Sequence, residues 1–428
     1  MKVLIFLNRQ LIQVRKGGLR VLTRKIKSVI FITLNILGCV LAIPFMIVLR
    51  LIRPIVLVRI GNLISSRIGH FTANTEMYLC EQETGINVPK QRYIDLFYLH
   101  HEPICNEQLL KIWRRQLRIF PYAMLAPLDK VNRIIPGGEL HVIHGIKSAL
   151  DTKNLLDKCP SHLKFTPDEE VLGERLLRDI GIPPGEKFIC LNVRDNAYLK
   201  THLGNSEFSY HDYRDSDIQS YVLAAEALAE RGYYVIRMGA KVNTSIKTKS
   251  VRIIDYATNG MRNEFMDIYL GVKCYFAIST GSGWDAIPEI ARRPIVYVNF
   301  VPLGYLHTSR EEFISISRRY YSAVDNRELT ISEIISCGAA FFLQTEEYRS
   351  NNIVLAENTP LEIRDVVIEM QERLSGTWKV DAMDEELQRR FWALYPVKSL
   401  DTNGNPLHGK ICARYGADFL RHHPEWLQ

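Results

Sequence analysis

The stretch FAISTGSGWDAIPEIARRPIVYVN, residues 276–299, decides the fold of the C-terminal half. An apolar run (Tyr275–Ile278) leads into a turn rich in glycine and serine, and a helix-forming segment (Gly283–Arg292) precedes a second apolar run (Ile295–Val298). This order of strand, turn, helix and strand predicts two parallel strands joined by a helix. We therefore expect a parallel sheet around this stretch.

The same alternation continues towards the N-terminus. The expected strands are Lys187–Val193, Tyr233–Met238 and Val251–Ile254, and the expected helices are Ser216–Arg231 and Asn263–Val272. Further helices are expected after Thr166, Thr330 and Thr359, because glutamate follows each threonine three residues later, as in a capping box. Continuous apolar strands between helices are typical of a doubly wound, nucleotide-binding α/β domain.

The chain is too long for a single core. With 428 residues it exceeds the size at which single cores stop growing, so two domains are expected. In the first half, Ile55–Ile60 and Arg92–Leu99 are typical of strands and Gln108–Ile119 of a helix. The expected parts are a basic and apolar N-terminal segment (1–53), a first α/β domain (54–165), a second α/β domain (166–345) and a helical segment that packs back on the domains (346–428).

The net charge of +7 originates at one end of the chain. Residues 1–75 contain twelve of the 54 lysine and arginine residues and no acidic residue, which leaves 42 basic against 47 acidic residues in the rest. A basic segment beside an apolar run favours contact with anionic lipid. Nucleic-acid binding is therefore not expected.

Residues 28–49 form an uncharged apolar run that is long enough to cross a bilayer. Three interpretations fit it: a transmembrane helix, an interfacial or re-entrant anchor bent at Pro44, and a buried first helix of the core. Basic residues lie on both sides, with Arg50 and Arg53 after the run, so we favour the bent anchor with both ends on the cytoplasmic face. A cleaved signal peptide is disfavoured because no small-x-small site follows.

Metal and disulfide chemistry have little support in the sequence. The eight cysteines are scattered without a CxxC pair, so neither a zinc ribbon nor a dense set of disulfides is expected. The pair His100–His101 has no carboxylate or cysteine at ligand spacing, which argues against a metal site there. We expect no metal and no other cofactor.

The turn Ser279–Asp285 is the sharpest candidate for a binding site. A glycine-rich turn at a helix N-terminus can offer backbone N–H groups and the positive end of the helix dipole to phosphate. The residues expected to contribute are Thr280, Gly281, Ser282, Gly283 and Asp285. The turn follows a strand, at the edge where open α/β sheets bind ligands, although an ordinary capped turn has the same pattern. It matches neither the P-loop nor GxGxxG.

Polar residues at the ends of the neighbouring strands could join this site. Arg194 can bind a diphosphate through two parallel hydrogen bonds, or form a salt bridge with a nearby aspartate such as Asp215. Arg237 and Gly239 follow the second strand and are weaker candidates. Glu289, two turns into the next helix, could accept hydrogen bonds from a ribose or face solvent.

A candidate base lies in the first half of the chain. His70 follows Gly69 in an expected loop of the first domain. Histidine titrates near neutral pH and can take a proton from a substrate hydroxyl, although a lone histidine is more often structural. Glu76 is a rival base.

Six segments resemble a family of predicted bacterial glycosyltransferases that is associated with surface-polysaccharide genes. They are RIGHFTANTEMYLCE (67–81), FICLNVRDNAYL (188–199), VIRMG (235–239), FAISTGSGWDAIPEIARRPIVYVN (276–299), NTPLEI (358–363) and GADFLRHHPEWL (416–427). The resemblance covers about residues 55–428. It implies a GT-B fold, with two Rossmann-like domains facing a cleft, the nucleotide-sugar donor on the C-terminal domain and the acceptor mainly on the N-terminal one. Gly69 would then lie on the acceptor side. Arg194 also resembles, more distantly, the strand-end arginine of GT-B fucosyltransferases, which contacts the donor diphosphate.

The sequence and the resemblance together predict a metal-independent hexosyltransferase at the cytoplasmic face of the inner membrane. His70 and Arg194 are its expected catalytic residues, its acceptor is a glycan or lipid-linked sugar, and residues 1–53 contact lipid. No Asp-x-Asp pair follows a suitable strand, so Arg194 and the helix dipole would neutralise the leaving diphosphate. The alternatives are a sugar-nucleotide epimerase on the same scaffold and a non-catalytic nucleotide-binding or scaffolding protein. A dinucleotide oxidoreductase is disfavoured because GxGxxG is missing.

Overall fold

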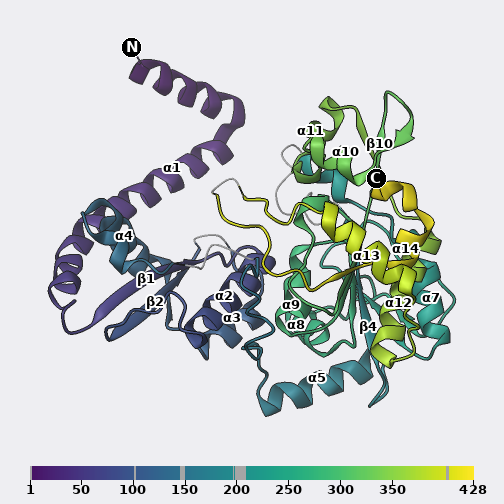
Figure 1. The fold of residues 1–428 in the computed structure, drawn as a ribbon. Helices are drawn as coiled ribbons and strands as arrows, with labels where there is room; N and C mark the ends of the chain where they lie inside the picture. Colours follow the sequence, from purple (N-terminus) through teal and green to yellow (C-terminus); the bar gives the residue numbers. More distant parts are fainter. Residues whose placement is uncertain (1, 101–102, 145–149, 196, 198–208, 402–403) are drawn as a thin grey trace. The chain divides into compact units, whose positions relative to one another are not determined.

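The computed structural model describes residues 2–428 apart from 101–102, 145–149, 196, 198–208 and 402–403 (Figure 1). The chain forms two compact units. Unit 1 comprises Met1–Ile64, Asn87–Pro103 and Gln116–Ile146, and unit 2 comprises Ser65–Ile86, Ile104–Arg115 and Lys147–Gln428. The units therefore interleave along the sequence, whereas the sequence prediction separated the two α/β domains at one boundary, after residue 165.

Unit 1 is built on a small parallel sheet. Its strands are β1 (Leu57–Leu63), β2 (Tyr93–Leu99) and β3 (Ile119–Phe120), in the order β1-β2-β3. Arg59 on β1 lies directly opposite Asp95 on β2, and the two side chains form a buried ion pair with hydrogen bonds of 2.7 and 2.6 Å. The other elements of this unit are α1 (Lys2–Leu51), α4 (Tyr122–Ile134) and the 3-10 helix η1 (Gly138–His141).

Helix α1 is the long apolar element of unit 1. Its backbone leaves helical angles at Gly18, where φ is +60°, and not at Pro44, where the sequence analysis placed a bend. The C-terminal half of α1 packs on α4. Among the described side chains of residues 28–49, only Ala42 and Met46 are buried, and most large apolar side chains are exposed. The interpretation as a helix buried in the core is therefore wrong. By length and composition, Val21–Leu51 could cross a membrane, which suggests membrane association.

Unit 2 contains the parallel sheet that the sequence predicts. Its strands are β4 (Phe188–Asn192), β5 (Tyr234–Arg237), β6 (Ile253–Ile254), β7 (Ala277–Ser279), β8 (Ile295–Phe300), β9 (Phe313–Ser317) and β13 (Arg414–Tyr415). They lie in the order β13-β9-β8-β7-β4-β5-β6, and every neighbouring pair is parallel. The strands are buried on both faces, as their continuous apolar sequences predict.

Helices cover both faces of this sheet. The helices of unit 2 are α2 (Ile68–Glu83), α3 (Glu107–Arg114), α5 (Pro167–Asp179), α7 (Val222–Glu230), α8 (Glu264–Lys273), α9 (Ala286–Ile290), α10 (Ile331–Ser336), α11 (Thr345–Ser350), α12 (Pro360–Ser375), α13 (Ala382–Leu394) and α14 (Ala417–His422). In Figure 1, α8 and α9 lie on one side of the sheet and α7 and α12 on the other. This layering confirms the doubly wound α/β class.

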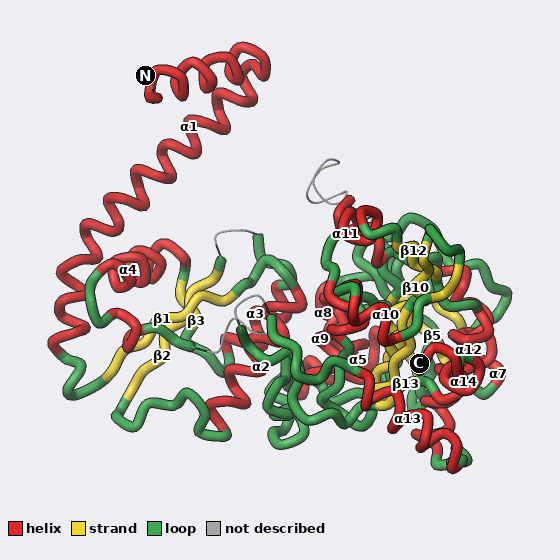
Figure 2. The backbone as a smooth tube through the Cα atoms, turned by 45° about the horizontal axis from the view of Figure 1, so that its top comes forward, coloured by secondary structure: helices red, strands yellow, loops and turns green. Residues whose placement is uncertain are grey.

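A separate three-stranded sheet and three capped helices complete unit 2. The small sheet is antiparallel and contains β10 (Arg319–Ser322), β11 (Arg327–Glu328) and β12 (Ile353–Ala356), in the order β11-β10-β12 (Figure 2). Thr166, Thr330 and Thr359 form the predicted capping boxes of α5, α10 and α12. The C-terminal segment after residue 345 belongs to unit 2, where β13 extends the main sheet.

The order of the main strands contains one reversal. From β4 the chain proceeds to β5 and β6 on one side, and from β7 to β8 and β9 on the other. The reversal therefore lies between β4 and β7, which are neighbours. In open α/β sheets, ligands bind outside the carboxyl ends of the strands at such a switch point. Asn192 ends β4 and Ser279 ends β7, so the candidate site is expected just beyond these two residues.

Candidate functional site

The loops that follow β4 and β7 are joined by polar contacts. The backbone N–H of Arg194 donates to Thr280 Oγ1 at 3.0 Å. Asn192 Nδ2 donates to Ser282 Oγ at 2.6 Å and to Asp285 Oδ1 at 3.1 Å. Two predicted binding segments, 192–195 and 279–285, therefore lie side by side at the switch point, as their positions at strand ends imply.

The glycine-rich turn is fixed by its own polar groups. Asp285 is buried, and its carboxylate accepts hydrogen bonds from Ser279 Oγ at 2.5 Å and from the backbone N–H of Ser282. Gly281 donates its N–H to Ser279 Oγ at 3.2 Å, and Trp284 donates to Ser282 Oγ at 3.2 Å. The expectation that this turn offers mainly free N–H groups needs correction, because several already bind side chains of the turn. Asp285 holds the turn in shape.

Gly281 is required by both its backbone and its surroundings. Its φ of +79° lies in the left-handed region, and a Cβ atom there would come within 2.7 Å of the Phe300 ring. The carbonyl of Gly281 accepts a hydrogen bond from Arg214 Nη2. Arg214 ends the 3-10 helix η2 (Ser209–Arg214), so a third segment reaches the site.

Two arginines and several aspartates give the site its charge. Arg194 Nε lies 3.3 Å from Asp215 Oδ1, and Arg194 is close enough to Arg214 to disfavour the charge of Arg214. Burial lowers the pKa of Arg214, and the charge of Arg194 lowers it further. Burial also raises the pKa of Asp215 to about 6, against the opposing effect of Arg194. Asp285 also favours the charge of Arg214, and Asp212 and Asp195 lie close enough to Asp215 to disfavour its charge, so several carboxylates surround the two cations.

Arg214 was missed by the sequence analysis. It lies about twenty residues beyond the end of β4, and residues 198–208 between them lie outside the described part. The available signal was the charged run HDYRDSD (211–217), which places cations and carboxylates close together just before the next helix. The prediction used only Asp215 from this run, as a salt-bridge partner of Arg194, and that contact is present.

The N-terminus of α2 reaches the same turn. The sequence prediction placed Gly69 and His70 in a loop, but α2 begins at Ile68, so both residues lie in its first turn. A Cβ atom on Gly69 would lie 2.9 Å from the Cα atom of Gly283, so the absence of a side chain permits this close approach. Arg67 provides no side-chain cap, and the first N–H groups of a helix have no partner within the helix.

His70 is half-buried at this end of α2. Burial lowers its pKa below the usual value, and the charge of Arg67 lowers it further, whereas a hydrogen bond with Asn74 opposes both. The imidazole is therefore neutral at neutral pH, the state that a general base requires. His70 belongs to unit 2 with the glycine-rich turn, not to the unit that contains β1.

Two other predicted donor-site residues, Arg237 and Gly239, lie at the end of β5. Arg237 is buried, donates to the carbonyl of Thr244 at 2.6 Å and pairs with Asp255 at 3.3 Å. Gly239 has a φ of +150° and allows the chain to turn after β5. Arg237 therefore connects the loop after β5 to the rest of the sheet, and nothing in these contacts indicates a ligand.

Glu289 has a partner that the sequence did not reveal. Its buried carboxylate lies 3.2 Å from Nδ1 of His307, whose ring stacks on Tyr297 with centroids 4.6 Å apart. Burial opposes the charge of His307, but Glu289, supported by Asp285, outweighs it and raises the pKa of His307. The alternative of a solvated helix residue is therefore excluded for Glu289.

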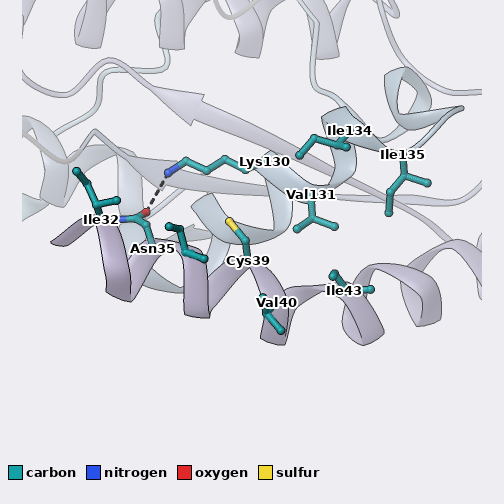
Figure 3. Close-up of a pocket in the computed structure, with 10 residues that line it drawn as sticks. Ile32, Asn35, Cys39, Val40, Ile43, Lys130, Val131, Ile134 and Ile135 are labelled. Atoms are coloured by element: carbon teal, nitrogen blue, oxygen red, sulfur yellow. Dashed lines mark hydrogen bonds between the residues drawn. The ribbon is translucent and has the colours of Figure 1, made fainter. Parts of the chain in front are cut away.

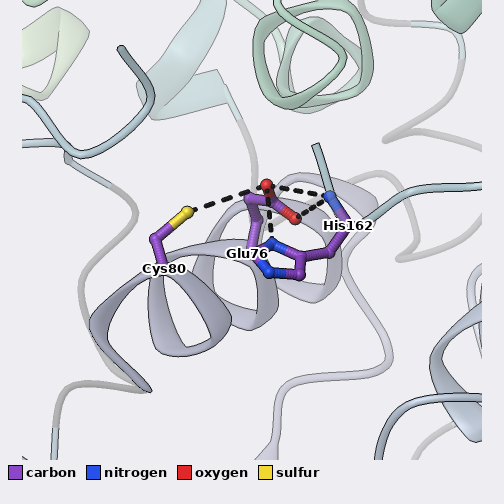
Figure 4. A group of neighbouring side chains, drawn as sticks. All are labelled: Glu76, Cys80 and His162. Carbon is purple, nitrogen blue, oxygen red and sulfur yellow. Dashed lines mark hydrogen bonds and ion pairs between the residues drawn. The ribbon is translucent and has the colours of Figure 1, made fainter. Parts of the chain in front are cut away.

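Glu76 lies in a different environment. Its fully buried carboxylate pairs with Arg292 Nη2 at 2.8 Å, and His162 contacts it through the backbone N–H at 3.3 Å and through Nδ1 at 3.2 Å. Figure 4 shows Glu76 and Cys80 on successive turns of α2 with His162 beside them. Glu76 is therefore already paired with a cation inside the protein, which makes it a poor candidate for the base.

The same group has the residue types of a metal site. Ligand atoms of Glu76, Cys80 and His162 all lie within 4.8 Å of one another. However, Arg292 Nη2 also lies 3.6 Å from Cys80 Sγ, so a cation already occupies this position. Burial raises the pKa of Cys80 well above its usual range, which disfavours the thiolate that metals bind. We therefore assign no metal here. His101, from the histidine pair of the sequence analysis, lies outside the described residues.

Comparisons with known proteins give likenesses of fold only. No protein-family model and no curated sequence matches the chain. Among solved structures, the ADP-heptose LPS heptosyltransferase II of E. coli is 15% identical over 61% of this chain and 90% of its own, with a TM-score of 0.36. A glycosyl transferase of family 9 from Veillonella parvula is 12% identical over 74% and 96%, with a TM-score of 0.41. A protein described as a UDP-N-acetylglucosamine 2-epimerase from Listeria monocytogenes is 9% identical over 56% and 79%, with a TM-score of 0.26.

Proposed function

We propose that this chain is a membrane-attached glycosyltransferase that uses a nucleotide-diphosphate sugar and needs no metal ion. The observation that carries the proposal is the pair Arg194 and Arg214 beside the glycine-rich turn, at the switch point of a doubly wound sheet. Arg214 Nε has no hydrogen-bond partner among the described residues. A diphosphate would accept hydrogen bonds from these guanidinium groups.

The donor would bind through the groups that already meet at this edge. The two guanidinium groups would hold the diphosphate, while the hydroxyls of Thr280 and Ser282 and the uncapped N-terminus of α2 would add hydrogen-bond donors. Glu289, held by His307, is proposed to lie near the ribose. The arginines would take the role that a metal ion has in other sugar transfers, which is to stabilise the charge of the leaving nucleotide.

The transfer step needs one base and no covalent change in the protein. The oxygen of an acceptor hydroxyl attacks the anomeric carbon, and the bond from that carbon to the diphosphate oxygen breaks. The electron pair leaves with the nucleoside diphosphate, where the arginines stabilise it, and an imidazole nitrogen of His70 takes the hydroxyl proton. His70 suits this role because it is neutral at neutral pH and lies next to the Gly69–Gly283 contact.

The acceptor is proposed to be a glycan or lipid-linked sugar close to the cytoplasmic face of the inner membrane. Residues 1–53 contain the exposed apolar helix and ten of the twelve basic residues of the N-terminal region, so they would attach the chain to anionic lipid. This location matches the cytosolic supply of nucleotide-sugars.

A transfer assay tests this proposal. The full chain in mild detergent would receive nucleotide-sugars and a lipid extract as acceptor, and movement of labelled sugar into the lipid phase would be measured. Arg194→Ala should reduce turnover at least tenfold, whereas Arg389→Ala, which breaks an exposed pair with Glu386, should not. Turnover of Arg194→Ala within a few-fold of the wild type would refute the role of Arg194. A new sugar nucleotide formed without acceptor would instead identify an epimerase, and tight binding without turnover a scaffolding protein.

A further inference from the structure

A groove runs between α1 and α4 in unit 1 (Figure 3). Its volume is about 600 Å³, within the range of small-molecule sites. The walls are mainly aliphatic side chains from both helices: Ile32, Ile36, Val40 and Ile43 from α1, and Val131 and Ile134 from α4. Such a lining suits a hydrocarbon chain and offers little to a polar ligand.

The two helices are held together firmly enough to maintain this groove. Ala42 and Met46 of α1 are buried, and a Cβ atom on Gly38 would lie 3.2 Å from Pro127 Cγ, so the helices approach closely there. At the end of α1, the guanidinium of Arg50 donates to Asn132 Oδ1 at 3.0 Å and to the carbonyl of Pro136 at 2.6 Å. The groove is therefore a feature of a packed helix pair.

One cation lies at the groove. Lys130 Nζ donates to Asn35 Oδ1 at 2.9 Å and to the hydroxyl of Tyr122 at 3.1 Å, and Figure 3 shows the first of these contacts. Both partners are neutral, and no ion pair among the described residues includes Lys130. Its charge is thus available to an anion at the groove.

We propose that this groove binds one acyl chain of an anionic phospholipid of the surrounding bilayer, with the phosphate near Lys130. The exposed apolar surface of α1 continues outside the groove, so the medium that covers it is the bilayer, and phospholipid is its most abundant component. The twelve basic residues of residues 1–75 favour an anionic head group over a neutral one. The proposal depends on membrane attachment but not on sugar transfer.

This binding mode would also fix the depth of α1 in the membrane. The exposed side chains of Lys130 and Arg133 lie on α4, and charged groups are costly at the centre of a bilayer. The end of the groove at Lys130 and Asn35 would therefore lie at head-group depth. The aliphatic remainder of the groove would lie towards the hydrocarbon of the same leaflet.

The test uses the full chain in vesicles of phosphatidylcholine and phosphatidylglycerol in equal parts. The chain would be extracted in mild detergent, and retained phospholipid would be counted by mass spectrometry of the intact complex. Val40→Trp fills the groove, whereas Val48→Trp changes a valine of similar exposure (54% against 57%) that does not line it. Val40→Trp should reduce retained lipid by about tenfold and Val48→Trp should not.

The head-group preference provides a second readout. Lys130→Gln should reduce the preference for phosphatidylglycerol by about fivefold, the factor that ~1 kcal/mol per basic residue near an anionic surface gives. Lys90→Gln, an exposed lysine of the same unit, should leave this preference unchanged.

The outcomes distinguish failure of the groove proposal from failure of membrane attachment. A chain that fails to float with vesicles would contradict membrane attachment and the groove together. A chain that floats but retains no lipid, or retains equal amounts in both tryptophan variants, would overturn the groove proposal alone. Retention of an isoprenoid phosphate from a native extract in place of phospholipid would also overturn it and would indicate an acceptor site.

Discussion

Helix α2 joins two charged regions of unit 2 that use similar residues in opposite ways. In its middle, Glu76 and Arg292 form a buried pair, and Arg292 also donates to the carbonyls of Cys159 at 2.9 Å and Pro160 at 3.1 Å. At its N-terminus, Arg194 pairs with Asp215 and Arg214 donates to the carbonyl of Gly281, while Arg214 Nε has no hydrogen-bond partner among the described residues.

The difference separates a structural site from a candidate binding site. The pair Glu76–Arg292 has few contacts left to offer, so a ligand there would have to displace protein groups. Arg214, at the strand ends, has a guanidinium donor without a partner among the described residues, so a ligand can still bind there.

The largest effect is expected from Arg292→Met. It leaves the Glu76 carboxylate buried without its cation, and loss of one partner of a buried pair costs about 3–5 kcal/mol. Chemical denaturation should show this loss. Combining Arg292→Met with Glu76→Gln should restore much of the stability, and equal loss in the single and double variants would contradict the assigned pairing.

The opposite pattern is expected from Arg214→Ala. Nucleotide affinity should fall by at least tenfold, because a hydrogen bond to a charged group contributes about 1.5–3 kcal/mol, while stability should change little. Calorimetric titration and thermal unfolding measure the two quantities. A large loss of stability with unchanged affinity would place Arg214 with Arg292 as a structural residue.

A smaller effect is expected from Gly69→Ala. The new methyl group would meet the Cα of Gly283 at 2.9 Å, and overpacking of this kind costs about 1–3 kcal/mol, reduced by the better helix propensity of alanine. Chemical denaturation should show a net loss of stability, and calorimetric titration should show weaker binding of the nucleotide. A gain in stability with normal binding would show that α2 does not need this close approach.

The smallest effect concerns pH. Burial raises the pKa of Asp215 to about 6, so below pH 6 the carboxyl is neutral and the arginines are less compensated. Affinity for a nucleoside diphosphate should therefore fall by about fivefold, relative to Asp215→Asn, as pH rises through 6. A raised pKa also means that the contribution of Asp215 to stability is greatest below its unfolded pKa and is lost as pH rises through 6. If the nucleotide affinities of the wild type and of Asp215→Asn changed in parallel with pH, this effect of Asp215 on binding would be contradicted.

Catalysis should depend on pH in the opposite direction. Burial lowers the pKa of His70, so the base is active at neutral pH, and the maximal rate should decline only when the pH falls below the usual range of histidine. His70→Gln should abolish this decline together with most of the activity, while nucleotide affinity stays near that of the wild type. An unchanged rate in His70→Gln would exclude it as the base.

The fold of unit 2 was largely predictable because its signals are local. Continuous apolar strands and three threonine–glutamate caps identify most elements within a few residues. The strands β9, β10, β11 and β12 of this unit were missed. The two-residue strands β13, and β3 of unit 1, were missed because pairing with a neighbour, not their sequence, makes them strands. The helix expected to reach Ile119 ends at Arg114.

The candidate site was predictable only where residues follow strand ends. Arg194 and Thr280 meet because parallel strands end at a common edge, which the strand order implies. The contacts of Arg214 with Gly281 and of Gly69 with Gly283 join segments far apart in sequence, so no local pattern reveals them. The pairs Glu76–Arg292 and Glu289–His307 were hidden for this reason too.

The most direct test of the nucleotide site is a calorimetric titration of the full chain in detergent with ADP, GDP, UDP, CDP and CMP, each with and without EDTA. The full chain is needed because α1 packs on α4. We predict that one diphosphate binds, that EDTA leaves its affinity unchanged, and that Arg194→Ala weakens it at least tenfold. If none of these nucleotides binds, the site at the ends of β4 and β7 is not a donor site, and the proposal of sugar transfer is contradicted.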